Sequence, residues 1–127
     1  MSGWQSYVDE QLVGTGQIRY AVIIGLDGLT WAQSPGYQLR GSEGKGIVAL
    51  FKRPAQVFDM GVVVNGVKYM GTKGDDRSIY GTKGATGVAL VKTQQAILIG
   101  FYDERQSPDL AANAVEKLAD HLTENGY

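Results

Sequence analysis

The second half of the chain alternates short apolar runs with turn residues, and this pattern limits the folds that the chain can adopt. Asn65-Gly66, the dipeptide that most favours a two-residue hairpin, separates the apolar residues 62–64 from residues 67–70. Further strand-like runs follow at residues 78–80, 88–92 and 96–102. Strands spaced about ten residues apart usually pair with their neighbours in sequence, so we expect an antiparallel meander.

The first half contains a second hairpin. Residues 18–26 are mostly apolar and rich in β-branched side chains, as in a strand that is buried on both faces. Asp27-Gly28 predicts a tight turn with both residues at positive φ, before a partner strand at residues 30–32. A middle helix is then expected, with Ser42 as its N-cap and its end near Phe51. Pro54 is expected to open a further helical turn.

Helices are predicted at both ends of the chain. Ser2 and Gln5 form a candidate capping box for the first helix, and Gly14 and Gly16 are expected to end it. Trp4, Tyr7, Val8, Gln11 and Leu12 are predicted to share one face of this helix.

The last helix has Ser107 as N-cap, Pro108 in its first turn and Gly126 at its end. Its predicted apolar arc comprises Leu110, Ala111, Ala114, Val115, Leu118, Ala119 and Leu122, and His121 falls inside that arc by angle.

Together these elements predict a single α+β domain over residues 1–127. A central antiparallel β-sheet is expected, with the N- and C-terminal helices on one face and the short middle helix on the other. The length of 127 residues is enough to bury a core without disulfides, and the chain has no cysteine.

Charge and hydropathy exclude several classes of function. The net charge of −1 gives no overall field for nucleic acid. The N-terminus lacks the pattern of a secretory signal, and every apolar run is far shorter than the roughly 20 residues of a membrane span. We therefore expect a soluble, cytosolic protein without an integral membrane segment.

The sequence also argues against an enzyme, a cofactor or a metal site. His121 is the only imidazole, and no nucleophile-elbow or phosphate-loop motif is present. The 18 glycines are interpreted as turn residues, and Asp75 and Asp76 as a solvated turn.

Aromatic residues gather near the two termini instead. Trp4, Tyr7, Trp31 and Tyr127 would form a shallow aromatic surface if the terminal helices lie side by side, and such a surface suits a stiff, proline-rich strand. Trp4 and Tyr7 could equally be core anchors. His121 has two interpretations, an aromatic wall beside Trp4 or a helix-end residue that answers a free carbonyl group.

Five segments, in order and at matching separations, resemble the profilin family, mostly its amoeboid, fungal and plant members. The segments are Trp4-Gln5-Ser6-Tyr7-Val8-Asp9, Leu12-Val13-Gly14-Thr15-Gly16, Asp27-Gly28 with Trp31-Ala32, residues 75–81 and residues 112–120. The resemblance covers essentially the whole chain and implies a non-enzymatic protein of the cytoplasm and cytoskeleton that binds monomeric actin and regulates its polymerisation.

The resemblance also implies two binding faces. Its proline-rich ligands, such as segments of formins, would contact Trp4, Tyr7, Trp31, His121, Leu122 and Tyr127. Its actin-binding positions would be Lys73, Arg77, Lys83, Lys92, Asn113, Glu116 and Lys117, and phosphoinositide head groups would bind basic residues that overlap these positions.

Three departures from the family pattern matter. Gly3 looks like an insertion before Trp4, His121 stands where amoeboid and plant relatives usually carry Tyr, and Thr82 thins the basic patch. Two rival functions remain open. One is a PAS- or GAF-like sensor of a small molecule, which needs an apolar pocket between sheet and helix. The other is a proline-peptide adaptor without actin binding.

Overall fold

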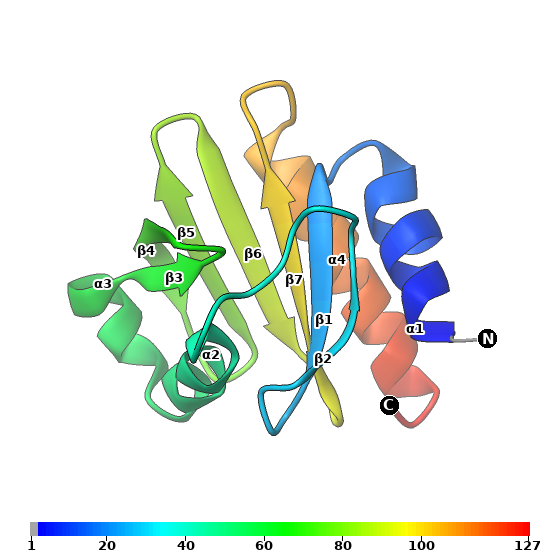
Figure 1. Ribbon diagram of the computed structural model, residues 1–127, viewed down its shortest axis with the longest axis horizontal. Helices are drawn as coiled ribbons and strands as arrows, with labels where there is room; N and C mark the ends of the chain where they lie inside the picture. Colours follow the sequence, from blue (N-terminus) through cyan, green and yellow to red (C-terminus); the bar gives the residue numbers. More distant parts are fainter. Residues whose placement is uncertain (1–2) are drawn as a thin grey trace.

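The centre of the molecule is one seven-stranded antiparallel sheet in the order β2-β1-β7-β6-β5-β4-β3 (Figure 1). The computed structural model describes residues 3–127. Its strands are β1 Tyr20–Gly25, β2 Thr30–Gln33, β3 Val62–Val64, β4 Val67–Gly74, β5 Ser78–Lys83, β6 Thr86–Lys92 and β7 Ala96–Tyr102. The predicted meander is confirmed, because β3 to β7 are neighbours in both sequence and space.

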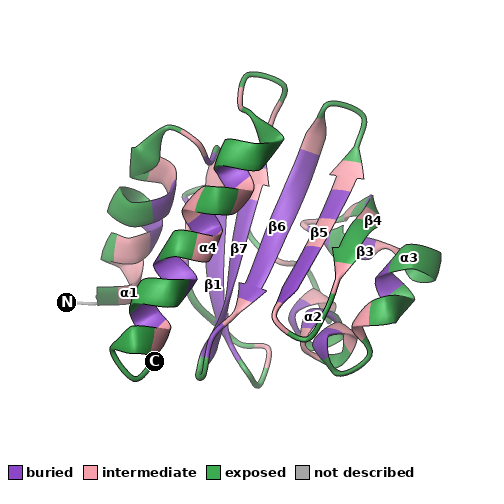
Figure 2. Cartoon of the chain, turned by 180° about the vertical axis from the view of Figure 1, so that it is seen from behind, coloured by how far each residue is buried: buried purple, intermediate pink, exposed green. Residues whose placement is uncertain are grey.

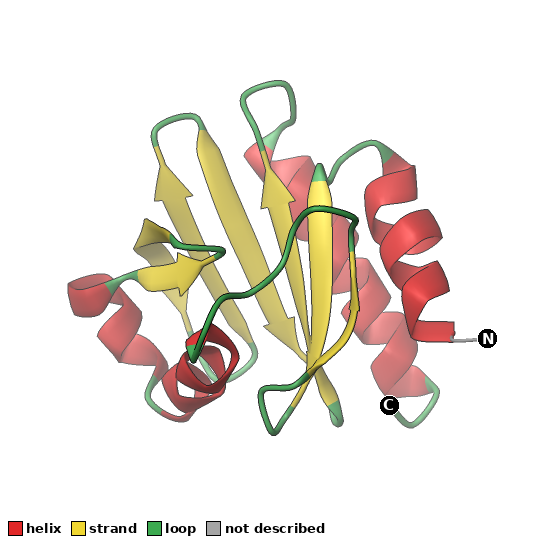
Figure 3. Cartoon of the chain, in the orientation of Figure 1, coloured by secondary structure: helices red, strands yellow, loops and turns green. Residues whose placement is uncertain are grey.

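Helices cover both faces of this sheet (Figures 1 and 3). The helical segments are α1 Gly3–Ser6, a π-helical stretch Tyr7–Leu12, a 3₁₀ turn Val13–Thr15, α2 Glu43–Lys52, a 3₁₀ turn Pro54–Gln56, α3 Val57–Met60 and α4 Pro108–Glu124. The terminal helices lie on one face and α2 lies on the other, as predicted. Within residues 3–127, no helix combines the length and apolar character that a membrane span requires.

Each face of the sheet has its own core. Ile23 and Leu98 pack with Leu12, Val115 and Leu122 under the terminal helices. Neighbouring strand residues point the other way, and there Ile24, Leu90, Ile97 and Ile99 pack with Ile47 and Phe51 of α2 and its surroundings. The central strands are therefore buried on both faces (Figure 2), which explains their continuous apolar sequence.

The two predicted tight turns differ. Asn65 and Gly66 both have positive φ, 51° and 78°, as predicted. At the other turn the prediction is wrong, because Gly28 has a φ of 86° but Asp27 does not lie at positive φ. The Asp27 carboxylate instead accepts a hydrogen bond from the Leu29 N–H at 3.0 Å, which closes the turn through the side chain.

The N-terminal helix is less regular than predicted. It passes from α to π geometry at Tyr7 and ends at Gly16, which has a φ of 80°. Ser2 lies outside the described residues. Ser42 occupies the N-cap position of α2 without a capping hydrogen bond, and Pro54 begins a 3₁₀ turn as predicted.

The last helix has the predicted ends but a narrower buried stripe. The Leu110 N–H donates to Ser107 Oγ at 3.4 Å. Leu110 and His121 are exposed, so placing them in the apolar arc was wrong. Successive helix residues are about 100° apart, so His121 turns outward while Leu122 points into the core.

Candidate functional site

Trp4 is the centre of a group of aromatic rings that we call the aromatic groove: Trp4, Tyr7, Trp31 and Tyr127. The Trp4 ring centroid lies 4.8 Å from Trp31, 5.7 Å from Tyr7 and 5.9 Å from Tyr127. A hollow of ≈ 230 Å³ is lined by Gly3, Trp4, Tyr7 and Tyr127. The structure thus brings together four residues from the two ends of the chain and from β2.

Gln5 holds the N-terminal helix against the edge strand β2. Its Nε2 donates to the Gln33 carbonyl at 3.0 Å, and its Oε1 accepts from the Gln33 N–H at 3.4 Å. The Gln5 amide thus makes the two hydrogen bonds to Gln33 that the backbone of a neighbouring strand would make. It fixes α1, with Trp4, beside β2, with Trp31.

The C-terminal residue is held by the turn between β6 and β7. The Tyr127 backbone oxygen accepts hydrogen bonds from Thr93 Oγ1 at 2.9 Å and from the Gln95 N–H at 2.7 Å. The Tyr127 N–H donates to the Leu122 carbonyl at 2.8 Å. The backbone of Tyr127 is therefore anchored, while the residue is 45% exposed and its ring lies beside Trp4.

The remaining two predicted groove residues are placed differently. Leu122 is fully buried in the core under the terminal helices, so it supports the groove from beneath. The His121 side chain is exposed on α4, and its carbonyl accepts hydrogen bonds from the backbone N–H and Nδ2 of Asn125.

The chemistry of the groove is that of its aromatic side chains. The groove offers flat apolar ring faces with an indole N–H or a phenol group at their edges, which suits an apolar ligand with free carbonyl groups. Within residues 3–127, no group of three or more His, Cys, Asp or Glu side chains is arranged to hold a metal ion.

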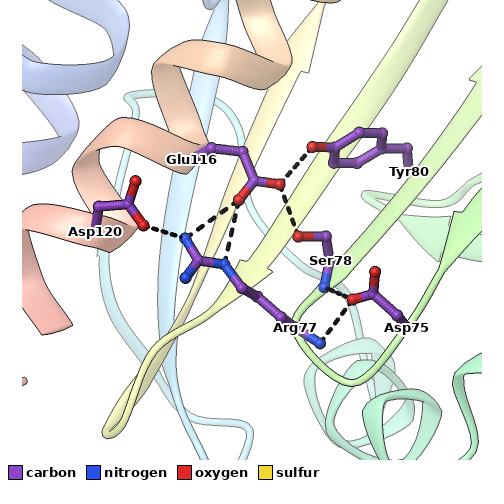
Figure 4. A network of polar contacts seen from close by, with 6 residues as sticks. All are labelled: Asp75, Arg77, Ser78, Tyr80, Glu116 and Asp120. Carbon is purple, nitrogen blue, oxygen red and sulfur yellow. Dashed lines mark hydrogen bonds and ion pairs between the residues drawn. The ribbon is translucent and has the colours of Figure 1, made fainter.

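A second group of polar residues joins α4 to β5, and Figure 4 shows it. Arg77 Nη2 contacts Asp120 Oδ1 at 2.6 Å and Glu116 Oε1 at 3.3 Å. Glu116 Oε2 accepts hydrogen bonds from Ser78 Oγ at 2.7 Å and from the Tyr80 hydroxyl. Both Glu116 oxygens are therefore engaged within the protein.

These contacts shift several pKa values. Burial and then the hydrogen bond to Glu116 raise the pKa of Tyr80. The hydrogen bond to Asp120 raises the pKa of Arg77. The N–H groups of Ser78 and Arg77 lower the pKa of Asp75, whose Oδ1 accepts from them at 2.7 and 2.9 Å.

We call the surface around this network the charged face: Lys73, Arg77, Asn113, Glu116, Lys117 and Asp120. Lys73 Nζ lies 5.4 Å from the Tyr80 ring centroid, and Asn113 and Lys117 are exposed on α4. Lys83 and Lys92 differ from this set. They alternate with Thr82 and Val91, so strand geometry directs them to the opposite side of the sheet.

Sequence reasoning missed two exposed apolar residues, Phe58 and Met70, which are 54% and 73% exposed. Together with Lys68 and Lys83, they line a hollow of ≈ 540 Å³. Exposed large apolar side chains that are rimmed by charge are typical of protein interfaces. The sequence signal for Met70 was its position next to Tyr69, since neighbouring strand residues point to opposite faces and Tyr69 is buried.

The chain is similar to one known family along almost its whole length. A family model described as Profilin matches residues 2–127. The chain is 65% identical to Profilin-P of Physarum polycephalum over 124 residues, which cover 98% of each chain.

Two solved structures have nearly the same fold. Acanthamoeba castellanii profilin IB has a TM-score of 0.95 at 47% identity, covering 98% of this chain and all of that one. Schizosaccharomyces pombe profilin has a TM-score of 0.96 at 40% identity with the same coverage.

Proposed function

This chain belongs to the profilin family, and we propose that it binds proline-rich segments through the aromatic groove and actin through the charged face. Family membership confirms the resemblance described above. The protein is a non-enzymatic, actin-binding protein that binds actin monomers and regulates their polymerisation.

The contact of Trp4 with three other aromatic rings carries the proline assignment. A polyproline II strand is stiff and has no internal hydrogen bonds, so its carbonyl groups remain free. Its rings can stack on the aromatic faces while the indole and phenol groups donate to those carbonyls. Formin-like segments of this composition are the partners we propose, with His121 at the outer rim.

Trp4→Ala tests this assignment. The variant should lose retention on poly-L-proline, because removing a central aromatic anchor costs roughly 1–3 kcal/mol of binding free energy. Phe58→Ala is the matched control, since it removes an exposed ring that is outside the groove. A folded Trp4→Ala protein that is retained like the parent would show that the groove does not bind proline.

For actin, we propose the charged face together with the hollow around Phe58 and Met70. Lys73 and Lys117 provide cationic contacts, and Asn113 a neutral polar one. Lys83 lines the apolar hollow. Lys92 is kept among the proposed actin positions on the family resemblance alone, because its side chain points to the opposite side of the sheet. Glu116 belongs to this surface as the residue that holds Arg77.

Phosphoinositide head groups are a further proposed ligand of these lysines, in a protein that we place in the cytoplasm and the cytoskeleton. Two carboxylates neutralise Arg77. Together with the absence of a lysine at Thr82, this favours a modest affinity for anionic lipids.

The alternative of a small-molecule sensor has no support in the packing under the terminal helices. A Cβ atom on Gly100 would lie 2.8 Å from both Ile18 Cδ1 and Val115 Cγ2. The space between sheet and helix is filled there, so it offers no pocket for a ligand.

A further inference from the structure

Gly25, the last residue of β1, lies where a side chain does not fit. An ideal Cβ atom on Gly25 would be 2.8 Å from Nε1 of Trp31 and 2.9 Å from its Cε2 and Cζ2 atoms. Carbon atoms in van der Waals contact are about 3.5–4.0 Å apart. The Trp31 indole therefore occupies the space that the side chain of residue 25 would need.

The backbone gives no reason of its own for a glycine at this position. Gly28, three residues later, has a φ of 86° and needs glycine for that conformation, but Gly25 is not at positive φ. Gly25 pairs in regular register with Ala96 of β7, and its N–H donates to the Leu29 carbonyl at 2.9 Å. Glycine inside a strand is destabilising and often marks a close approach of another group. Here the approaching group is the indole.

The position of Trp31 affects the whole aromatic groove. Its ring centroid is 4.8 Å from that of Trp4, and the residue is still 38% exposed. Trp31 is thus confined by the β1 backbone beneath it and by Trp4 beside it. A methyl group at residue 25 would push the indole away from that backbone and change its contact with Trp4.

We propose that Gly25 is a positioning residue of the aromatic groove, which holds Trp31 against Trp4 by leaving room for the indole. The proposal rests on the proline binding proposed above. Gly25 itself contacts no ligand in this scheme and acts only through Trp31.

Gly25→Ala tests the proposal. The affinity for a proline decamer should fall roughly tenfold, as expected when one aromatic anchor is displaced. The coupled circular dichroism of the adjacent indoles should weaken as well. In a Trp31→Ala background, the same Gly25→Ala change should cause no further loss of affinity, whereas a general loss of structure would cost the same in both backgrounds.

Gly46→Ala is the matched control, because a Cβ atom there meets nothing within 4 Å. If Gly25→Ala alone folds poorly, recovery of its thermal stability by Trp31→Ala would establish the clash. A parent protein that fails to bind the decamer would overturn the groove assignment itself. Suppose instead that the parent binds the decamer. Then the role of Gly25 alone would be overturned if Gly25→Ala bound equally well, or if Gly25→Ala lost the same affinity with Trp31 present and with Trp31→Ala.

Discussion

Glu116 holds three neighbouring side chains in place within the charged face. Its carboxylate accepts from Ser78, Tyr80 and Arg77, and so connects β5 with α4. Buried or half-buried carboxylates need such donors, because an unpaired charge is costly to remove from water. The same contacts fix Arg77 at the centre of the charged face.

Glu116→Gln should lower the free energy of unfolding by about 1–2 kcal/mol, because one amide oxygen must replace two carboxylate oxygens that face three donors. The loss of the negative charge should also lower the pKa of Tyr80, although burial will still keep that pKa raised. Urea denaturation and NMR titration of the Tyr80 ring measure the two effects. Glu124→Gln, an exposed change on the same helix, is the control, and equal losses for both variants would contradict the role of Glu116.

Residue-level predictions succeeded where the cause was local. Asn65-Gly66 determines its own turn, whereas Asp27 closes a different turn through its side chain. Arg77 and Glu116 were assigned to one face by resemblance, but their ion pair could not be inferred. It joins residues 39 apart in sequence, and no local periodicity encodes such a pairing.

At the scale of elements, β2 is an edge strand that the N-terminal helix covers. The order of the sheet leaves one side of β2 without a neighbouring strand. Gln5 satisfies both the N–H and the carbonyl of Gln33 on that side. Exposed strand edges can pair with other chains, so this contact both protects the edge and aligns α1 with β2.

Gln5→Ala should lower stability by about 1 kcal/mol and should accelerate hydrogen exchange at the Gln33 N–H more than at other amides of β2. NMR-detected hydrogen exchange measures this directly. Gln11→Ala removes an exposed amide from the same helical segment and should change neither quantity. Unaltered exchange at Gln33 in the Gln5 variant would mean that the side-chain contact is not formed in solution.

The number and order of the elements could be predicted because strand alternation and helix capping are properties of short segments. The structure differs from these predictions in two elements, and neither difference follows from the sequence pattern of a short segment. β4 continues past Met70 to Gly74, because its glycines allow close packing against the backbone carbonyls of Val57 and Pro54. The π-helical stretch from Tyr7 has no marker in the sequence, since its longer hydrogen bonds do not require particular residues.

At the scale of the whole molecule, the two proposed surfaces belong to different edges of the sheet. The aromatic groove lies at the β2 edge with both chain ends, and the charged face lies farther along the sheet, where α4 meets β5 through the contacts of Figure 4. α4 reaches both surfaces. Near its end His121 is exposed and the buried Leu122 supports the groove from beneath, and Asn113 to Lys117 lie in its middle. One helix thus takes part in two proposed surfaces that share no residue.

Lys117→Glu should therefore weaken actin-monomer binding at least tenfold and leave proline binding unchanged. The substitution places a negative charge where a cation is proposed to meet an acidic surface, and like charges across an interface cost several kcal/mol. Lys52→Glu makes the same charge change at the end of α2, on the other face of the sheet, and controls for net charge. Fluorescence titration with labelled actin and with a proline decamer measures both affinities for each variant. Equal loss of both ligands in the Lys117 variant, or equal loss of actin in the Lys52 variant, would contradict the separation of the two surfaces.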